Sequence, residues 1–153
     1  MVVKGKHEFN ISKEQLWVYL MDVEVLAKIT PGITRLEELG DDRFRSYSEM
    51  KIGPVKGTFT GKMHVVNKDE YKYFQIKMEQ LSRIGNARVI VNMNIEEREG
   101  TVALAFDGEA NLSGIIAMTS QRVLSGAAKL LTKEIFSALE KHIEENDTTT
   151  EDM

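Results

Sequence analysis

The stretch KIGPVKGTFTGKM, at residues 51–63, predicts a tight turn followed by a bent β-strand. Gly53-Pro54 favours the turn, because proline has no N–H to donate inside a central strand. After the turn, alternate residues are expected to face inward: Gly57, Phe59, Gly61 and Met63. Glycine permits strong coiling and leaves room on its face of a strand. We therefore expect this strand to curve around another element and to leave space beneath it.

The same period of two continues through residues 33–112, with short turn-like connections. Such alternation predicts half-buried antiparallel strands, and the short connections favour a meander of hairpins. Two polar residues, Ser46 and Ser48, fall on the inward face. Four methionines on that face come from four different strands: Met50, Met63, Met78 and Met93.

Helical patterns flank the strand region. Ser12 and Gln15 have the spacing of a capping box, which predicts a helix start. A second short helix is expected at 23–29, where Pro31-Gly32 then ends it. Beyond the strands the apolar period returns to 3.6, which predicts one long amphipathic helix ending near residue 143.

The chain of 153 residues is long enough for one domain with its own core. We expect a single domain at 1–143. The remaining segment, 144–153, is acidic and has almost no apolar side chains, so it is expected to be a disordered tail.

These elements have few ways to pack. They predict an α+β protein in which a curved antiparallel β-sheet wraps around the long C-terminal helix, with two short helices after the first strand. Where a bent sheet and a straight helix diverge, the space must hold large side chains, a ligand, or both. The residues expected to line such a cavity are Ser46, Ser48, Met50, Phe59, Gly61, Met63, Phe74, Met78, Val91, Met93, Leu104, Phe106, Leu124, Leu131 and Ile135.

Two interpretations of these inward residues stay open. Methionine adapts to apolar ligands of variable shape, but it also fills irregular cores. Met118, close to the start of the long helix, is expected to join the inward methionines. The hydroxyls of Ser46 and Ser48 need hydrogen-bond partners if buried, and either the backbone or a polar group of a ligand would serve.

The composition argues against several other classes of protein. A net charge of -4 disfavours a general nucleic-acid binder. The chain has no cysteine, and His7, His64 and His142 lack metal-ligand spacing, so these histidines are expected to be structural or exposed. No acid–base pair, nucleophile elbow or phosphate loop appears, and no cofactor is expected. Without a signal pattern or a membrane-length apolar run, a cytoplasmic protein is expected.

The order of elements and three motifs resemble the carbon monoxide dehydrogenase G subunit (CoxG) family over about residues 1–143. The motifs are PGI at 31–33, GPVKGTFTGKM at 53–63 and SGIIAMTSQRVLSGAAKLLTKEIFSAL at 113–139. That family belongs to the START-like, polyketide-cyclase-like (SRPBCC) superfamily. The resemblance implies a helix-grip (START/Bet v 1-like) fold with a hydrophobic cavity between the sheet and the long helix.

The resemblance also implies a role beside a molybdenum-containing carbon monoxide dehydrogenase or a related hydroxylase. Its members are linked to membrane recruitment of that enzyme or to handling of a lipophilic partner, with a quinone as a natural candidate. We therefore expect a non-catalytic protein that binds a quinone or another lipid-like molecule, with at most peripheral contact with the inner face of the membrane. The alternatives are a cyclase, dehydratase or hydrolase that uses the same cavity, and a pure assembly factor without a ligand.

Overall fold

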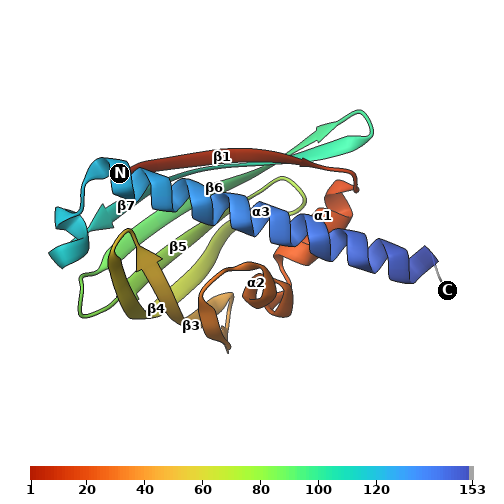
Figure 1. Ribbon diagram of the computed structural model, residues 1–153. Helices are drawn as coiled ribbons and strands as arrows, with labels where there is room; N and C mark the ends of the chain where they lie inside the picture. Colours follow the sequence, from red (N-terminus) through yellow and green to blue (C-terminus); the bar gives the residue numbers. More distant parts are fainter. Residues whose placement is uncertain (152–153) are drawn as a thin grey trace.

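The computed structural model describes residues 1–151, except for the side chains of Val55 and of residues 147–151. The chain forms a sheet, three α-helices and one 3-10 helix (Figure 1). The elements in chain order are β1 (Val2–Phe9), α1 (Lys13–Leu20), α2 (Val23–Ile29), β2 (Ile33–Gly40), β3 (Arg43–Ile52), β4 (Val55–Asp69), β5 (Tyr73–Leu81), β6 (Ala87–Arg98), β7 (Thr101–Leu112), η1 (Gly114–Met118) and α3 (Gln121–Glu151).

The seven strands form one antiparallel sheet in the order β1-β7-β6-β5-β4-β3-β2. Each strand from β2 to β7 pairs with its neighbour in the chain, as expected for a meander, and β1 closes the sheet by pairing with β7. Helix α3 crosses one face of the curved sheet, and α1 and α2 lie beside its second half (Figure 1). The predicted fold, a curved antiparallel sheet gripping a long C-terminal helix, is confirmed.

The first helix begins at the predicted capping box. The amide of Gln15 donates to the Ser12 hydroxyl at 3.1 Å, and the amide of Ser12 donates to the Gln15 side chain at 3.2 Å. The next helix has its own cap, since the Asp22 carboxylate accepts from the Glu24 amide at 2.9 Å. These bonds satisfy donors that the start of a helix leaves unpaired.

The turn predicted at Gly53-Pro54 connects β3 to β4 and rests on the start of α3. Gly53 has a φ of 60°, a conformation that favours glycine. A side chain at this position would also collide with Val123 of α3. The loop between β5 and β6 lies alongside, because a Cβ at Gly57 would stand 2.6 Å from the Cδ1 of Ile84. We call the β3–β4 turn, the β5–β6 loop and η1 together the η1 end.

Apart from Val91 and Ala103, the buried hydrophobic side chains fall into two groups. The main hydrophobic cluster lies where α1, α2 and the second half of α3 meet the sheet, and it includes Leu16, Leu104 and Leu139. A smaller group near the η1 end lies outside this cluster and comprises Phe59, Ile116 and Leu124. The main cluster therefore lies at the end of the molecule with α1 and α2, and the smaller group at the η1 end is not part of it.

Helix α3 is longer than predicted. It continues through Glu151, whereas the sequence analysis ends the helix near residue 143 and expects disorder from 144 onward. Residues 144–151 contain neither glycine nor proline, so no residue there stops the helix. Residues 152–153 of the expected tail lie outside the described residues.

Candidate functional site

A polar pair lies on the inner face of the sheet. The strand register places Ser46 of β3 opposite Gly61 of β4, and Gly61 opposite Gln80 of β5. The Gln80 amide donates to the Ser46 hydroxyl at 3.3 Å, across the strand between them. Its side chain occupies the position where a Cβ on Gly61 would stand. The missing side chain of Gly61 therefore makes room for the Gln80 amide.

Both serines point inward as expected. Ser46 is 6% exposed and Ser48 is 5% exposed, and they are the two buried polar residues of the described chain. Among the described side chains, no fully buried nitrogen or oxygen atom lacks a hydrogen-bond partner. The inner face thus carries hydroxyl and amide groups without an uncompensated polar atom.

The other predicted lining residues divide between core and partly exposed positions. Two of them, Phe74 and Leu104, belong to the main hydrophobic cluster. Four more pack against that cluster while remaining partly exposed: Met63, Met93, Phe106 and Ile135. Three are buried without belonging to it: Phe59, Val91 and Leu124. The residues left are Met50, Met78 and Leu131, which are partly exposed and lie outside the cluster.

We call the six residues Ser46, Ser48, Met50, Met78, Gln80 and Leu131 the inner patch. Helix α3 approaches the backbones of α2, β1 and β3 most extensively, rather than those of the central strands. Met78 lies on central strand β5, and Leu131 lies on α3 between buried Leu124 and partly exposed Ile135. The partial exposure of these side chains indicates that α3 does not seal the sheet here.

Gln80 is the site residue that the sequence analysis missed. It shares the parity of Phe74 and Met78 in its strand, so the same alternation places it inward. Met118, by contrast, was expected to face inward and does not, because it is 85% exposed in η1, before α3 begins. The chain leaves β7 through a 3-10 turn that buries Ile116 instead.

Two shallow surface depressions lie elsewhere. One, of about 300 Å³, lies over α1 beside Val18 and Tyr19. The other, of about 410 Å³, lies on the outer face of the sheet beside Ile90 and Asn92. Neither depression lies between α3 and the inner face.

His7 and His142 make ring and hydrogen-bond contacts, and His7 also pairs with a carboxylate. His7 on edge strand β1 stacks on Phe136, with ring centroids 5.2 Å apart, and its Nε2 lies 2.8 Å from a carboxylate oxygen of Glu140. The Nδ1 of His142 lies 3.1 Å from the ammonium of Lys28. His7 therefore ties α3 to an edge of the sheet.

The pKa values of Glu96 and Tyr71 are shifted, and both residues lie outside the inner patch. A hydrogen bond and an ion pair with Lys6, at 2.9 Å, hold the pKa of Glu96 below its usual range. A hydrogen bond to the neighbouring Glu70 raises the pKa of Tyr71. Within the part of the chain that the structure describes, no three His, Cys, Asp or Glu side chains gather as a metal site would require. No helix of the described residues is long and apolar enough to cross a membrane.

Known structures share this architecture. A conserved protein from Geobacillus kaustophilus has a TM-score of 0.90 at 24% identity, with 95% of this chain and 96% of that chain covered. A START superfamily protein from Mycobacterium smegmatis has a TM-score of 0.71 at 16% identity, with 94% and 97% covered. A protein from Thermus thermophilus has a TM-score of 0.71 at 11% identity, with 95% and 99% covered. At these identities the likeness shows the fold, which is START-like.

A search of curated proteins found no match. The sequence profile of the family described as the carbon monoxide dehydrogenase G subunit (CoxG) matches residues 5–144 of the 153-residue chain. Two of the three motifs behind the family resemblance, at 53–63 and 113–139, meet where Gly53 of the β3–β4 turn lies against Val123 of α3. The chain belongs to the CoxG family of carbon monoxide dehydrogenase subunits.

Proposed function

We propose that the protein binds a hydrophobic small molecule between α3 and the inner face of the sheet, without catalysing a reaction on it. The observation that carries the proposal is the inner patch, where Met78 and Leu131 stay partly exposed and the sheet beside Met78 carries the hydrogen bond from the Gln80 amide to the Ser46 hydroxyl. Ligand sites of this kind combine apolar walls with a few polar groups that orient the ligand. A quinone fits this chemistry, because its ring oxygens accept hydrogen bonds while its chain is apolar.

The ligand would enter by displacing flexible side chains. Methionine and glutamine change rotamer at low cost, so Met78 and Gln80 can give way without moving the strands. In a family named for a subunit of carbon monoxide dehydrogenase, this site supports an auxiliary role: handling a lipophilic partner of such an enzyme or of a related hydroxylase.

Two neighbouring leucines on α3 provide a matched test. Leu131 lies on the sheet-facing side of the helix and Leu130 is 57% exposed on its outer side. Leu131→Trp fills the proposed space, so binding of a short-chain quinone should weaken by at least about tenfold. Leu130→Trp adds the same volume outside and should bind as the wild type does. Isothermal titration measures the affinity, and circular dichroism checks that both variants fold.

Solvent extraction of the purified protein, followed by mass spectrometry, identifies any ligand carried from the cell. The proposal fails if neither quinones nor fatty acids are found or taken up. It also fails if the two tryptophan variants bind a quinone equally well. Co-purification with oxidoreductase subunits in the absence of any ligand would instead support a pure assembly factor.

A further inference from the structure

The outer face of β3, β4 and β5, which points away from α3, carries an excess of basic side chains. The alternate, outward positions of residues 43–51, 56–66 and 73–81 hold six lysines or arginines and two glutamates. The whole chain, by contrast, has 20 lysines and arginines against 24 aspartates and glutamates. The basic residues of this face are Arg43, Arg45, Lys51, Lys56, Lys62 and Lys77. Positive charge is therefore concentrated here against the overall balance.

Five residues at the centre of this face lie next to one another across three strands, and we call Arg43, Arg45, Lys62, His64 and Lys77 the outer patch. The strand register places Arg43 opposite His64 and Arg45 opposite Lys62. It also places His64 opposite Lys77. Like charges directly opposite each other destabilise a sheet. The pairing of Arg45 with Lys62 is therefore a local cost that the packing of the sheet does not explain.

The carboxylates around the outer patch pair with other cations. Glu37 is opposite Arg45 in the register, but its carboxylate pairs with Arg35. Glu79 is opposite Lys62 and lies 3.8 Å from the Nε of Arg88.

At the β2–β3 turn, the carboxylate of Asp42 lies 2.7 Å from the ammonium of Lys68. Among the described residues, none of the five side chains of the outer patch forms an ion pair. The outer patch is therefore a cluster of cationic side chains that lacks its own counter-charges.

We propose that the outer patch binds an acidic segment of a partner protein in an extended conformation, with carboxylates at alternate positions. Side chains on one face of a strand repeat about every 6.6–6.8 Å, and an extended peptide has the same repeat. Carboxylates at every second residue would therefore match Arg43 and Arg45 along β3, or Lys62 and His64 along β4. This surface lies on the opposite face of the sheet from the proposed ligand space, and its use does not require a bound ligand.

An aromatic residue of the same face favours carboxylates over the bases of a single-stranded nucleic acid. Proteins that bind single strands stack bases on exposed aromatic rings. Tyr47 is on this face, but the guanidinium of Arg35 covers its ring, with the central carbon 5.6 Å from the ring centroid. The chemistry that remains exposed is point charge, which suits an acidic peptide.

Two labelled peptides of identical composition test the surface by fluorescence anisotropy. In one, glutamate and threonine alternate, and in the other the glutamates form a single block. The full chain should bind the alternating peptide at low salt, and should bind the block peptide at least about threefold more weakly. Salt of about 0.5 M should abolish binding, because it shortens the screening length to about 4 Å.

Charge-reversal variants locate the binding surface. Arg43→Glu with Lys77→Glu changes two exposed residues of the outer patch. Each change replaces an attraction by a repulsion, so the alternating peptide should bind at least about fivefold more weakly.

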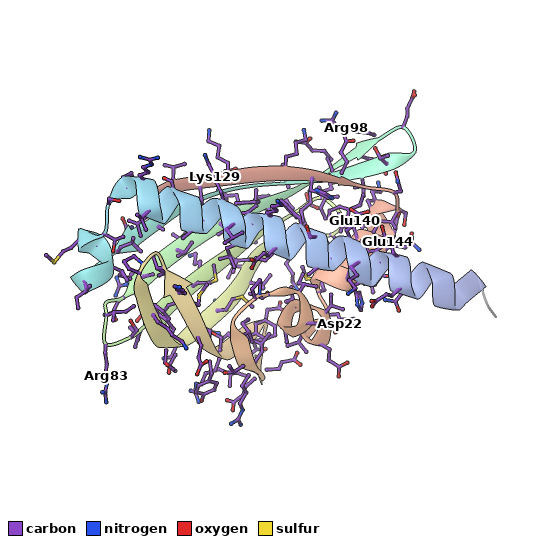
Figure 2. All side chains as sticks on the ribbon, in the orientation of Figure 1. Asp22, Arg83, Arg98, Lys129, Glu140 and Glu144 are labelled. Atoms are coloured by element: carbon purple, nitrogen blue, oxygen red, sulfur yellow. The ribbon has the colours of Figure 1, made fainter. Side chains whose placement is uncertain are left out.

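The matched control is Arg83→Glu with Lys129→Glu, which changes the net charge equally. Both residues are exposed, and Figure 2 shows Arg83 at one end of the molecule and Lys129 on α3. This control pair should lose clearly less affinity than the patch pair, and circular dichroism checks that both variants fold.

The outcomes separate this proposal from its rivals. The proposal is overturned if the alternating peptide does not bind, or if the patch variant binds it as well as the control variant does. Equal affinity for the two peptides would overturn the extended geometry. Tighter binding of a single-stranded RNA of the same charge would assign the surface to nucleic acid instead. Quinone affinity should be unchanged in the patch variant, and Leu131→Trp should still bind the peptide, so the ligand proposal can fail independently.

Discussion

At the residue scale, the most informative contact is the Gln80 side chain lying over Gly61. A glycine inside a strand usually marks a bend or a close approach, and here it marks the approach of an amide. The hydrogen bond from Gln80 to Ser46 spans a strand that has no side chain in between. A side chain at position 61 would therefore first disturb the hydrogen bond from Gln80 to Ser46.

A double-mutant cycle tests this coupling. Gly61→Ala places a methyl group where the Gln80 amide lies, which should displace the amide, break its bond to Ser46 and cost about 1 kcal/mol in urea unfolding. In a Gln80→Ala background the same change meets no amide and should cost less. The coupling energy should be about 0.5–1.5 kcal/mol. Strictly additive effects would mean that Gln80 does not occupy this position in solution.

At the element scale, α3 is held at separate points along its length. Val123 meets the β3–β4 turn at Gly53, and Thr132 lies close to β1, where a Cβ on Gly5 would stand 3.1 Å from its methyl group. Further along, Glu140 reaches His7 and Glu145 pairs with Lys28 at 3.3 Å. These contacts involve β1, the β3–β4 turn and α2, and Phe136 adds a ring contact with Phe106 of β7, with centroids 6.0 Å apart.

Gly53 and Gly100 have similar backbone conformations, so comparing substitutions at the two positions separates backbone strain from collision of the added side chain. Gly53 has a φ of 60° and lies against Val123, whereas Gly100 has a φ of 73° and a Cβ added there would have no other atom within 4 Å. Gly100→Ala should cost about 1 kcal/mol through the backbone alone. Gly53→Ala should cost more, and Val123→Ala should recover part of the difference. Equal losses in thermal unfolding would show that the turn does not rest on α3.

At the scale of the whole molecule, the divided core predicts uneven stability. The main cluster contains side chains from α1, α2, α3 and the sheet, while the group with Phe59, Ile116 and Leu124 is small. Regions with fewer buried apolar contacts open at lower free energy. The second half of α3 should therefore be the more stable part of that helix.

Hydrogen exchange measures this difference directly. Amides in residues 121–131 should exchange faster than those in residues 132–143, and a bound quinone should slow the first set more than the second. Uniform protection along α3 in the free protein would contradict the divided core.

Much of the fold was predictable because strand alternation and helical periodicity are local signals. The capping box at Ser12 and the turn at Gly53 are local as well, and both appear as expected. The contact of Gln80 with Ser46 is not local, because it depends on the register of three strands. The outward position of Met118 depends on a 3-10 turn that periodicity does not reveal. The proposed ligand space likewise depends on how far α3 stands from the central strands.

The pairing of β1 with β7 sets the order in which the sheet can be completed. The amino group of Met1 donates to the carbonyl of Ala110 at 3.0 Å, a sequence separation of 109 residues. Closing so long a loop carries a large entropic cost before any contact repays it. The hairpins from β2 to β7 have no such delay, so we expect them to form first. During synthesis, the first strand to leave the ribosome would then be the last to join the sheet.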